Sequence, residues 1–291
     1  MNVKIEPLPP GKIETSIPGG LVSTTLSELG GALPGTFGPG GGRIPYTFNP
    51  PTMGTLKRIG ELRARKDVNT PGKLAVAALV RALATLGSRD LAQGAEGAHA
   101  AEVAKLSIGD VLTLTFAWQL ARAPEGVELK DQACARCGEA FETVRVDLGT
   151  LKVRALPELG EGAEPPAARV GLRRGFKLPD GSKVTTVLLR SPSWADVFWL
   201  LDEKGWANPA LIQAFTLKGA IAGTDAEHDG IRPSVTMREI DQLWPEDVAL
   251  IEEALAQIVA SPDLRVECRC PSCGADNLIG LSWADPGFFG G

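Results

Sequence analysis

The sequence predicts an α+β protein in which a helical unit occurs twice, each copy ending in a strand, a cysteine knuckle and a second strand. Three observations predict this fold class. Two helix starts share the same capping pattern, the spacings that follow them agree within one residue, and each copy ends in a Cys-x-x-Cys-Gly unit. Matching order and spacing of this kind is typical of an internal repeat.

The paired helix starts are Thr70-Pro71 and Asn208-Pro209, each a capping side chain followed by proline at the first helical position. The apolar stretches after them predict helices that end at Gly87 and Gly223. Because proline at the first turn loses no helical hydrogen bond, both starts are well defined.

A second pair of helices begins near Asp110 and Asp247, forty residues after Thr70 and thirty-nine after Asn208. We expect both carboxylates to cap their helices and to interact favourably with the helix dipole. Paired carboxylates could instead act as an acid and a base, but no further catalytic group accompanies them.

Upstream of these helices, residues 52–65 and 193–205 both resemble helices that begin at a hydroxyl residue. The second carries a Ser-x-x-Asp capping box at Ser193 and Asp196. It also contains Trp194 and Trp199, whose spacing does not keep them on one helix face. Packing in the core is the default for both tryptophans, and an exposed position in a partner-binding surface is the alternative.

The remaining segments define the expected domain organisation. Residues 1–50 form a Gly/Pro-rich N-terminal arm, since residues 30–42 contain seven glycines and two prolines. The first repeat spans 51–155, a linker 156–169, and the second repeat 170–291, which opens with a hairpin around Asp180-Gly181. A short edge strand at 44–50 is the counterpart of this hairpin.

The two cysteine knuckles are CARCG at 134–138 and CPSCG at 270–274. Two such pairs are the usual ligands of a structural zinc ion, and glycine permits the tight turn after the second cysteine. We therefore expect Cys134, Cys137, Cys270 and Cys273 to hold one Zn²⁺ per chain in a split zinc ribbon.

Cys268, the fifth cysteine, falls outside the paired pattern, and we interpret it as a free thiol with ligand exchange as the alternative. Thiol redox chemistry is the competing use of the knuckles. It favours a Cys-x-x-Cys at a helix start, whereas strand-like residues flank both pairs here.

Composition limits the function classes. A formal charge of −5 disfavours general nucleic-acid binding, although a zinc-ribbon adaptor that binds nucleic acid stays an alternative. Its support would be two groups of basic residues: Lys57, Arg58, Arg63, Arg65 and Lys66, and Arg173, Arg174 and Lys177. Neither a membrane span nor a secretory leader is indicated, so we expect a cytoplasmic protein.

Catalytic residues are not evident. His99 and His228 are the two histidines, and both lie in polar contexts without a serine or carboxylate arrangement that suggests a triad. We expect no enzyme activity and no small-molecule substrate.

The order of these features resembles the baseplate hub assembly chaperone family of T-even-type contractile phages, which has relatives in bacterial contractile injection gene clusters. The resemblance covers roughly residues 44–289. The stretch LSIGDVLTLTFAWQLAR with Gly109-Asp110, the two knuckles, and DPGFF at 285–289 carry it.

This resemblance implies a non-enzymatic role in assembling, or forming part of, the central hub of a contractile-tail baseplate. The implied partners are hub or spike proteins, and the implied location is the cytoplasm or an assembled phage-tail-like particle. Phe288 and Phe289 would then be partner-binding residues or would dock on the chain itself.

Overall fold

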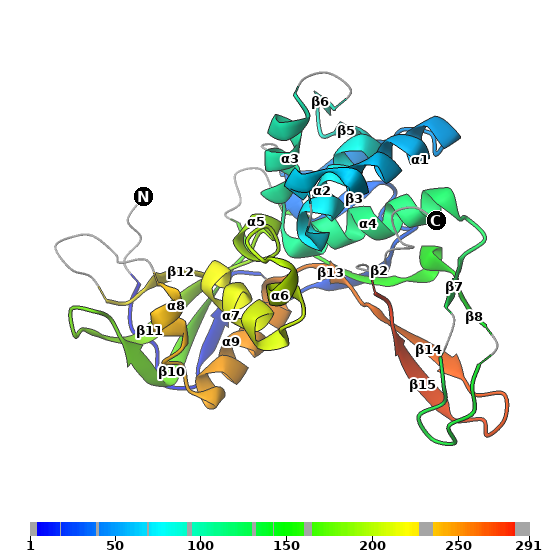
Figure 1. Cartoon of the computed structure of the whole chain (residues 1–291). Helices are drawn as coiled ribbons and strands as arrows, with labels where there is room; N and C mark the ends of the chain where they lie inside the picture. Colours follow the sequence, from blue (N-terminus) through cyan, green and yellow to red (C-terminus); the bar gives the residue numbers. More distant parts are fainter. Residues whose placement is uncertain are drawn as a thin grey trace.

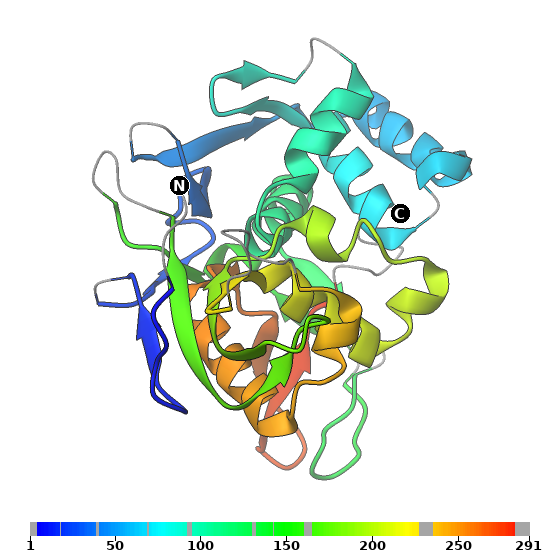
Figure 2. The same cartoon turned by 90° about the vertical axis from the view of Figure 1, so that its left-hand side faces the viewer.

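The computed structural model describes residues 5–17, 19–38, 41–68, 70–91, 95–129, 132–141, 143–159, 165–226 and 235–282. It is a mixed α+β structure with several small antiparallel sheets, which confirms the α+β part of the predicted fold class. Figure 1 shows three parts: a helical body that contains α1–α4, a second body around β10 and β11, and two hairpins that project away from both. Figure 2 shows the same hairpins extending from the base of the molecule.

The first body, here called the first half, contains a four-stranded sheet in the order β3-β4-β5-β6 and the helices that pack on it. Its elements are β3 (Ala32–Phe37), β4 (Arg43–Phe48), α1 (Met53–Gly60), η1 (Glu61–Ala64), η2 (Lys66–Val68), α2 (Pro71–Ala82), β5 (Leu83–Leu86), β6 (Arg89–Asp90), α3 (Glu96–Ala104) and α4 (Ile108–Arg122).

The second body, the second half, contains a four-stranded sheet in the order β1-β10-β11-β12. Its elements are β1 (Ile13–Thr15), β10 (Ala167–Lys177), β11 (Lys183–Arg190), α5 (Trp194–Val197), α6 (Glu203–Trp206), α7 (Pro209–Ala220), β12 (Ile221–Thr224), α8 (Met237–Ile240) and α9 (Pro245–Ile258).

The projecting hairpins and a small central sheet complete the fold. The hairpins pair β7 with β8 and β14 with β15, and the central sheet has the order β13-β9-β2. Their elements are β2 (Val22–Thr25), β7 (Val127–Leu129), β8 (Val144–Val146), η3 (Leu148–Thr150), β9 (Lys152–Ala155), β13 (Ser261–Pro262), β14 (Arg265–Arg269) and β15 (Asp276–Gly280).

Three strands and one helix follow the same order in both halves, and two of these strands pair with the same register. Each has two consecutive antiparallel strands, then a helix that leads directly into a third strand, and this third strand pairs with the second. In each sheet the pairing skips one residue of the third strand. The pairs are Tyr46–Leu86, Thr47–Thr85 and Phe48–Leu83 in the first half, and Val187–Thr224, Leu188–Gly223 and Leu189–Ile221 in the second.

A buried aspartate at the third position of α4 and of α9 ties the helix to a strand, β3 in the first half and β10 in the second. Asp110 accepts a hydrogen bond from the backbone N–H of Gly35 in β3 at 2.8 Å. Asp247 accepts from the backbone N–H groups of Arg173 at 2.6 Å and Gly175 at 3.0 Å in β10. Both strands are irregular at this point, because their register shifts there. The carboxylates therefore satisfy strand donors that no neighbouring strand can reach.

The expected capping residues are confirmed at three helices. The side chains of Thr70 and Asn208 accept from the first-turn backbone of α2 and α7, and Ser193 forms the capping box with Asp196 at α5. The cap of α4 is Ser107, so the helix begins two residues before Asp110.

The helix ends differ from the prediction. The helix of the first half ends at Ala82 and that of the second at Ala220, and β5 and β12 follow without a break. The residues of β5 and β12 are apolar enough to form either a helix or a strand. Their pairing with β4 and β11 favours the strand, because strand preference depends on tertiary context. Gly87, the expected helix stop, instead turns the β5–β6 hairpin with φ +62°.

Residues 1–50 also differ from an extended arm. Strands β1, β2, β3 and β4 lie in this segment, and each pairs within one of the sheets. The glycine-rich stretch could form β3 because it is paired on one side and anchored by Asp110. The strand expected at 44–50 lies between β3 and β5 instead of at an edge. It tolerates Pro45 because its pairing with β3 is interrupted next to it.

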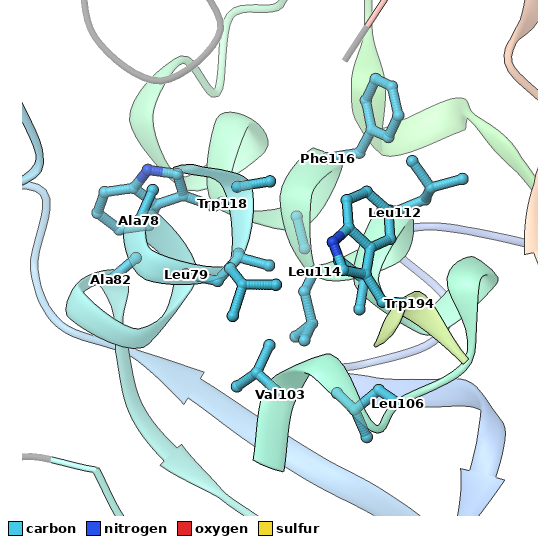
Figure 3. Packing of buried hydrophobic residues seen from close by; sticks show 14 of the residues in the cluster. Ala78, Leu79, Ala82, Val103, Leu106, Leu112, Leu114, Phe116, Trp118 and Trp194 are labelled. Carbon is cyan, nitrogen blue, oxygen red and sulfur yellow. The ribbon is translucent and has the colours of Figure 1, made fainter. Parts of the chain in front are cut away.

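Two hydrophobic clusters form the main core, one in each half. Figure 3 shows the first cluster, where α2, α3 and α4 supply most of the labelled side chains and Trp194 of α5 joins them. The largest fully buried side chains include Trp118, Trp194 and Phe116. The first half is thus completed by a side chain from the second.

Candidate metal centre

The two Cys-x-x-Cys-Gly segments adopt the same backbone turn. The N–H of Gly138 donates to the carbonyl of Cys134 at 2.9 Å, and the N–H of Gly274 donates to the carbonyl of Cys270 at 3.0 Å. Both glycines have positive φ, +74° and +69°. Side-chain-bearing residues rarely adopt this conformation, so the glycine in each motif is required by the turn.

A second bond closes each turn from the other side. The N–H of Cys134 donates to the carbonyl of Glu139 at 2.9 Å, and that of Cys270 donates to the carbonyl of Ala275 at 2.8 Å. The cysteines are thereby fixed at the tip of a hairpin, with β7 and β8 below the first knuckle and β14 and β15 below the second.

The four cysteine sulfur atoms form one small cluster. Cys134 Sγ is 3.7 Å from Cys273 Sγ, Cys137 Sγ is 3.7 Å from Cys270 Sγ, and all four lie within 4.8 Å of one another. A tetrahedral zinc site with metal–sulfur bonds of about 2.3 Å places its sulfurs roughly 3.8 Å apart. A disulfide would need about 2.05 Å. The spacing therefore fits four thiolates around one metal ion.

Burial divides the four ligands into two kinds. The first cysteine of each knuckle, Cys134 and Cys270, is 2% exposed, whereas Cys137 and Cys273 are exposed. The pKa of the Cys134 thiol is lowered to about 6, first because the backbone N–H of Cys137 donates to its sulfur and also because that of Arg136 does so. Deprotonation, which metal binding requires, is favoured at this sulfur.

A polar residue outside the cysteine pattern joins the two knuckles. The side-chain oxygen of Asn277 accepts from the N–H of Ala135 at 2.9 Å, and its amide nitrogen donates to the carbonyl of Ala275 at 2.9 Å. Asn277 is 7% exposed. Sequence reasoning missed it, because its position on β15 gives no signal until the two hairpins are brought together.

Cys268 is separate from the cluster. It lies on β14 opposite Asn277 and is half-buried against the small apolar group that includes Phe141 and Ile279. Burial raises the pKa of its thiol, as does its proximity to Cys134 and Cys270. The four-cysteine cluster found among the described residues does not include it.

The aromatic partner-binding candidates are placed differently by the structure. Trp194 is fully buried and its indole N–H donates to the carbonyl of Gly72 at 3.0 Å, so it packs in the core and does not form a partner-binding surface. Trp199 is half-buried and packs against the same core. Phe288 and Phe289 lie outside the described residues.

The two basic groups carry nearby acidic partners. Arg65 forms ion pairs with Asp67 at 2.6 Å and Glu96 at 2.7 Å, and Arg174 pairs with Glu246 at 2.6 Å. These pairs reduce the positive potential that a nucleic acid would need. His99 lies half-buried on α3, and His228 lies outside the described residues.

Of the helices in the described part of the chain, none is both long and apolar enough to cross a bilayer. Comparison with protein-family models, with curated proteins and with solved structures gives no match to this chain.

Proposed function

We propose that Cys134, Cys137, Cys270 and Cys273 hold one structural zinc ion per chain. The observation that carries this proposal is the cluster of four sulfurs within 4.8 Å of one another, with two pairs at 3.7 Å. Four protein ligands fill the coordination of zinc and leave no position for a reacting water, which is typical of structural sites. Metal analysis of freshly purified protein should give one zinc per chain, and protein without zinc would refute the proposal.

The metal joins the two halves of what we propose to be a duplicated unit with a split zinc ribbon. The matching strand registers, the paired aspartates and the identical knuckle turns support the duplication. One knuckle follows each half in the sequence, so neither copy of the unit can complete the site alone.

Within this frame, the chain acts as a non-enzymatic scaffold in a contractile tail, either as an assembly chaperone of the baseplate hub or as part of that hub. The resemblance in order and spacing supports this role, together with a metal site that favours structure over catalysis. The partners would be hub or spike proteins, as in a phage tail or a contractile injection system.

Co-expression tests this role directly. Hub and spike proteins encoded beside the chain should co-elute with it in size-exclusion chromatography, in a complex of fixed stoichiometry. A chain that ends before Asp285 should keep its zinc and its fold but lose the complex, if Phe288 and Phe289 bind the partner. Absence of any complex with the full chain would contradict the baseplate role. The zinc proposal would be unaffected by that result, because metal analysis tests it separately.

A further inference from the structure

One short segment of the second half forms two backbone hydrogen bonds with the first half. Pro192–Trp194 lies against the start of α4: the N–H of Ile108 donates to the carbonyl of Pro192 at 3.2 Å, and the N–H of Trp194 donates to the carbonyl of Leu106 at 2.9 Å. Ser107 and Ser193 form an isolated antiparallel bridge between these bonds. The side chain of Trp194 enters the core of the first half. We call this contact the joint.

Beside the joint, two glycines of the first half lie against other backbone of the second half. A Cβ on Gly109 would lie 1.7 Å from the carbonyl oxygen of Ala260, and a Cβ on Gly72 would lie 2.3 Å from that of Phe198. In both cases the colliding atom belongs to the backbone, which cannot shift without a cost in free energy. The receiving surface therefore consists of Gly72 and residues 106–109.

The second half has counterparts of these positions, because Asp247 matches Asp110 at the third position of its helix and Asn208 matches Thr70 as a cap. All four counterparts differ in a way that closes the surface. The matched pairs, first half before second, are Gly72 and Ala210, Ser107 and Trp244, Ile108 and Pro245, and Gly109 and Glu246.

Each change removes something that the joint needs. Pro245 has no N–H to replace the donor of Ile108. Glu246 places a charged side chain where Gly109 has none, and it is held by its ion pair with Arg174. Trp244 is 47% exposed, and the Arg174 guanidinium lies over its ring at 4.1 Å from the centroid. In the second half, side chains of the same half therefore cover the positions that match the receiving surface.

The first half, in contrast, keeps the inserting segment. Residues 50–53 are PPTM where 191–194 are SPSW, and the hydroxyl caps Thr52 and Ser193 occupy the same place before α1 and α5. Met53 stands where Trp194 does and is 80% exposed. This segment has a proline carbonyl, that of Pro51, and an apolar side chain, that of Met53, at the positions that Pro192 and Trp194 occupy in the joint. Among the described residues, neither group makes a contact like that of its counterpart.

We infer that the second half is a terminal unit: its receiving surface is closed against a second copy of the chain, while residues 50–53 can dock on a repeat of this kind whose receiving surface is open. A joint between unlike surfaces that repeated from copy to copy would build an open filament, and terminal units prevent this in repeat proteins. The inference rests on the matching of the halves and is independent of the baseplate role.

Two complementary chains test it. The opened chain carries Ala210→Gly, Trp244→Ser, Pro245→Ile and Glu246→Gly, which copy the receiving surface of the first half, together with Met53→Asp, which disables its own inserting segment. Analytical ultracentrifugation should show the wild-type chain and the opened chain as monomers when each is alone. An equimolar mixture should form a 1:1 complex, because only the wild-type chain has Met53 and only the opened chain has the free surface.

The matched control replaces the wild-type chain in the mixture with a Met53→Asp chain, and this mixture should stay monomeric. The inference is overturned if the opened chain is folded, with its metal and native circular dichroism, and still binds no wild-type chain. It is also overturned if the wild-type chain self-associates in a way that Met53→Asp abolishes. If the four changes prevent folding, the pair Trp244→Ser and Glu246→Gly with Met53→Asp gives a milder opened chain, and a weaker complex with the same dependence on Met53 is expected.

Discussion

Asp110 and Asp247 occupy the same helical position but face different donors. Asp247 accepts from three consecutive backbone N–H groups, those of Arg173, Arg174 and Gly175. Asp110 accepts from one, that of Gly35, and from the hydroxyls of Thr36 and Ser107. A hydroxyl can rotate to accept instead of donate, whereas a backbone N–H cannot. Replacement of the carboxylate by another group should therefore be tolerated less well at position 247 than at position 110.

Asp247→Asn should destabilise the protein by about 2 kcal/mol or more, because an amide group would place N–H atoms against fixed donors. Asp110→Asn should cost less, about 1 kcal/mol, since Thr36 and Ser107 can reorient. Burial raises the pKa of the Asp110 carboxyl, against the hydrogen bonds that lower it, which also makes a neutral group more acceptable there. Urea unfolding measures both free energies.

The matched control for these variants is Asp241→Asn, at an exposed position next to α8, which should change stability little. Equal losses at positions 110 and 247 would contradict the distinction between fixed and rotatable donors.

Gly109→Ala should destabilise the protein by about 3 kcal/mol, since the new methyl group would collide with the Ala260 carbonyl. Gly97→Ala on α3 is its control, because no atom lies within 4 Å of the added Cβ. This control should be neutral or stabilise by about 0.5–1 kcal/mol. The difference in thermal midpoint between the two variants checks the prediction, and a Gly109→Ala chain as stable as the parent would show that the joint can yield.

At the scale of the elements, the two hairpins have little core of their own. Buried side chains between them include Phe141 and Ile279 besides the cysteines Cys134 and Cys270. A two-stranded hairpin alone is marginally stable in water. The hairpins therefore depend on the metal and on the Asn277 bridge for their mutual position.

Cys137→Ser should reduce the zinc content well below one per chain, even though this ligand is exposed, because three thiolates leave the tetrahedral site incomplete. Cys268→Ser should keep one zinc per chain, since the sulfur cluster does not include it. Metal analysis after dialysis against a weak chelator compares the two variants. Zinc loss in the Cys268→Ser chain would instead assign that thiol a part in binding.

The elements that the sequence predicts well are those defined by local chemistry. The caps at Thr70, Asn208 and Ser193 and the two knuckle turns depend on side chains within a few residues of one another. Strands β5 and β12 could not be predicted in this way, because their apolar residues also suit a helix end and only pairing with distant strands decides between the two. Asn277 and the burial of Trp194 depend in the same way on contacts between the halves.

At the scale of the whole molecule, the two main cores lie in separate bodies, and the four cysteines belong to neither. The hairpins project from these bodies in both views (Figures 1 and 2). Metal removal should therefore act locally and should not unfold the two bodies.

Treatment with a strong chelator should leave the far-UV circular dichroism close to that of the metal-bound protein, since α2, α4, α7 and α9 pack within the two cores. Hydrogen exchange should increase at 127–146 and 265–280, where the hairpins lose their common ligand. Zinc addition should restore protection. Loss of the helical signal together with the metal would mean that both cores depend on the ion.

The two knuckles also differ in time of synthesis, because 132 residues separate Cys137 from Cys270. At about 5–20 residues per second, the interval between them on the ribosome is on the order of 10 s. During that interval the first knuckle offers two sulfurs where four are needed, so it is open to oxidation or to the wrong metal. Completion of the metal site is then a late step of biogenesis, and it can occur only in a compartment that keeps Cys134 and Cys137 reduced until their partners arrive.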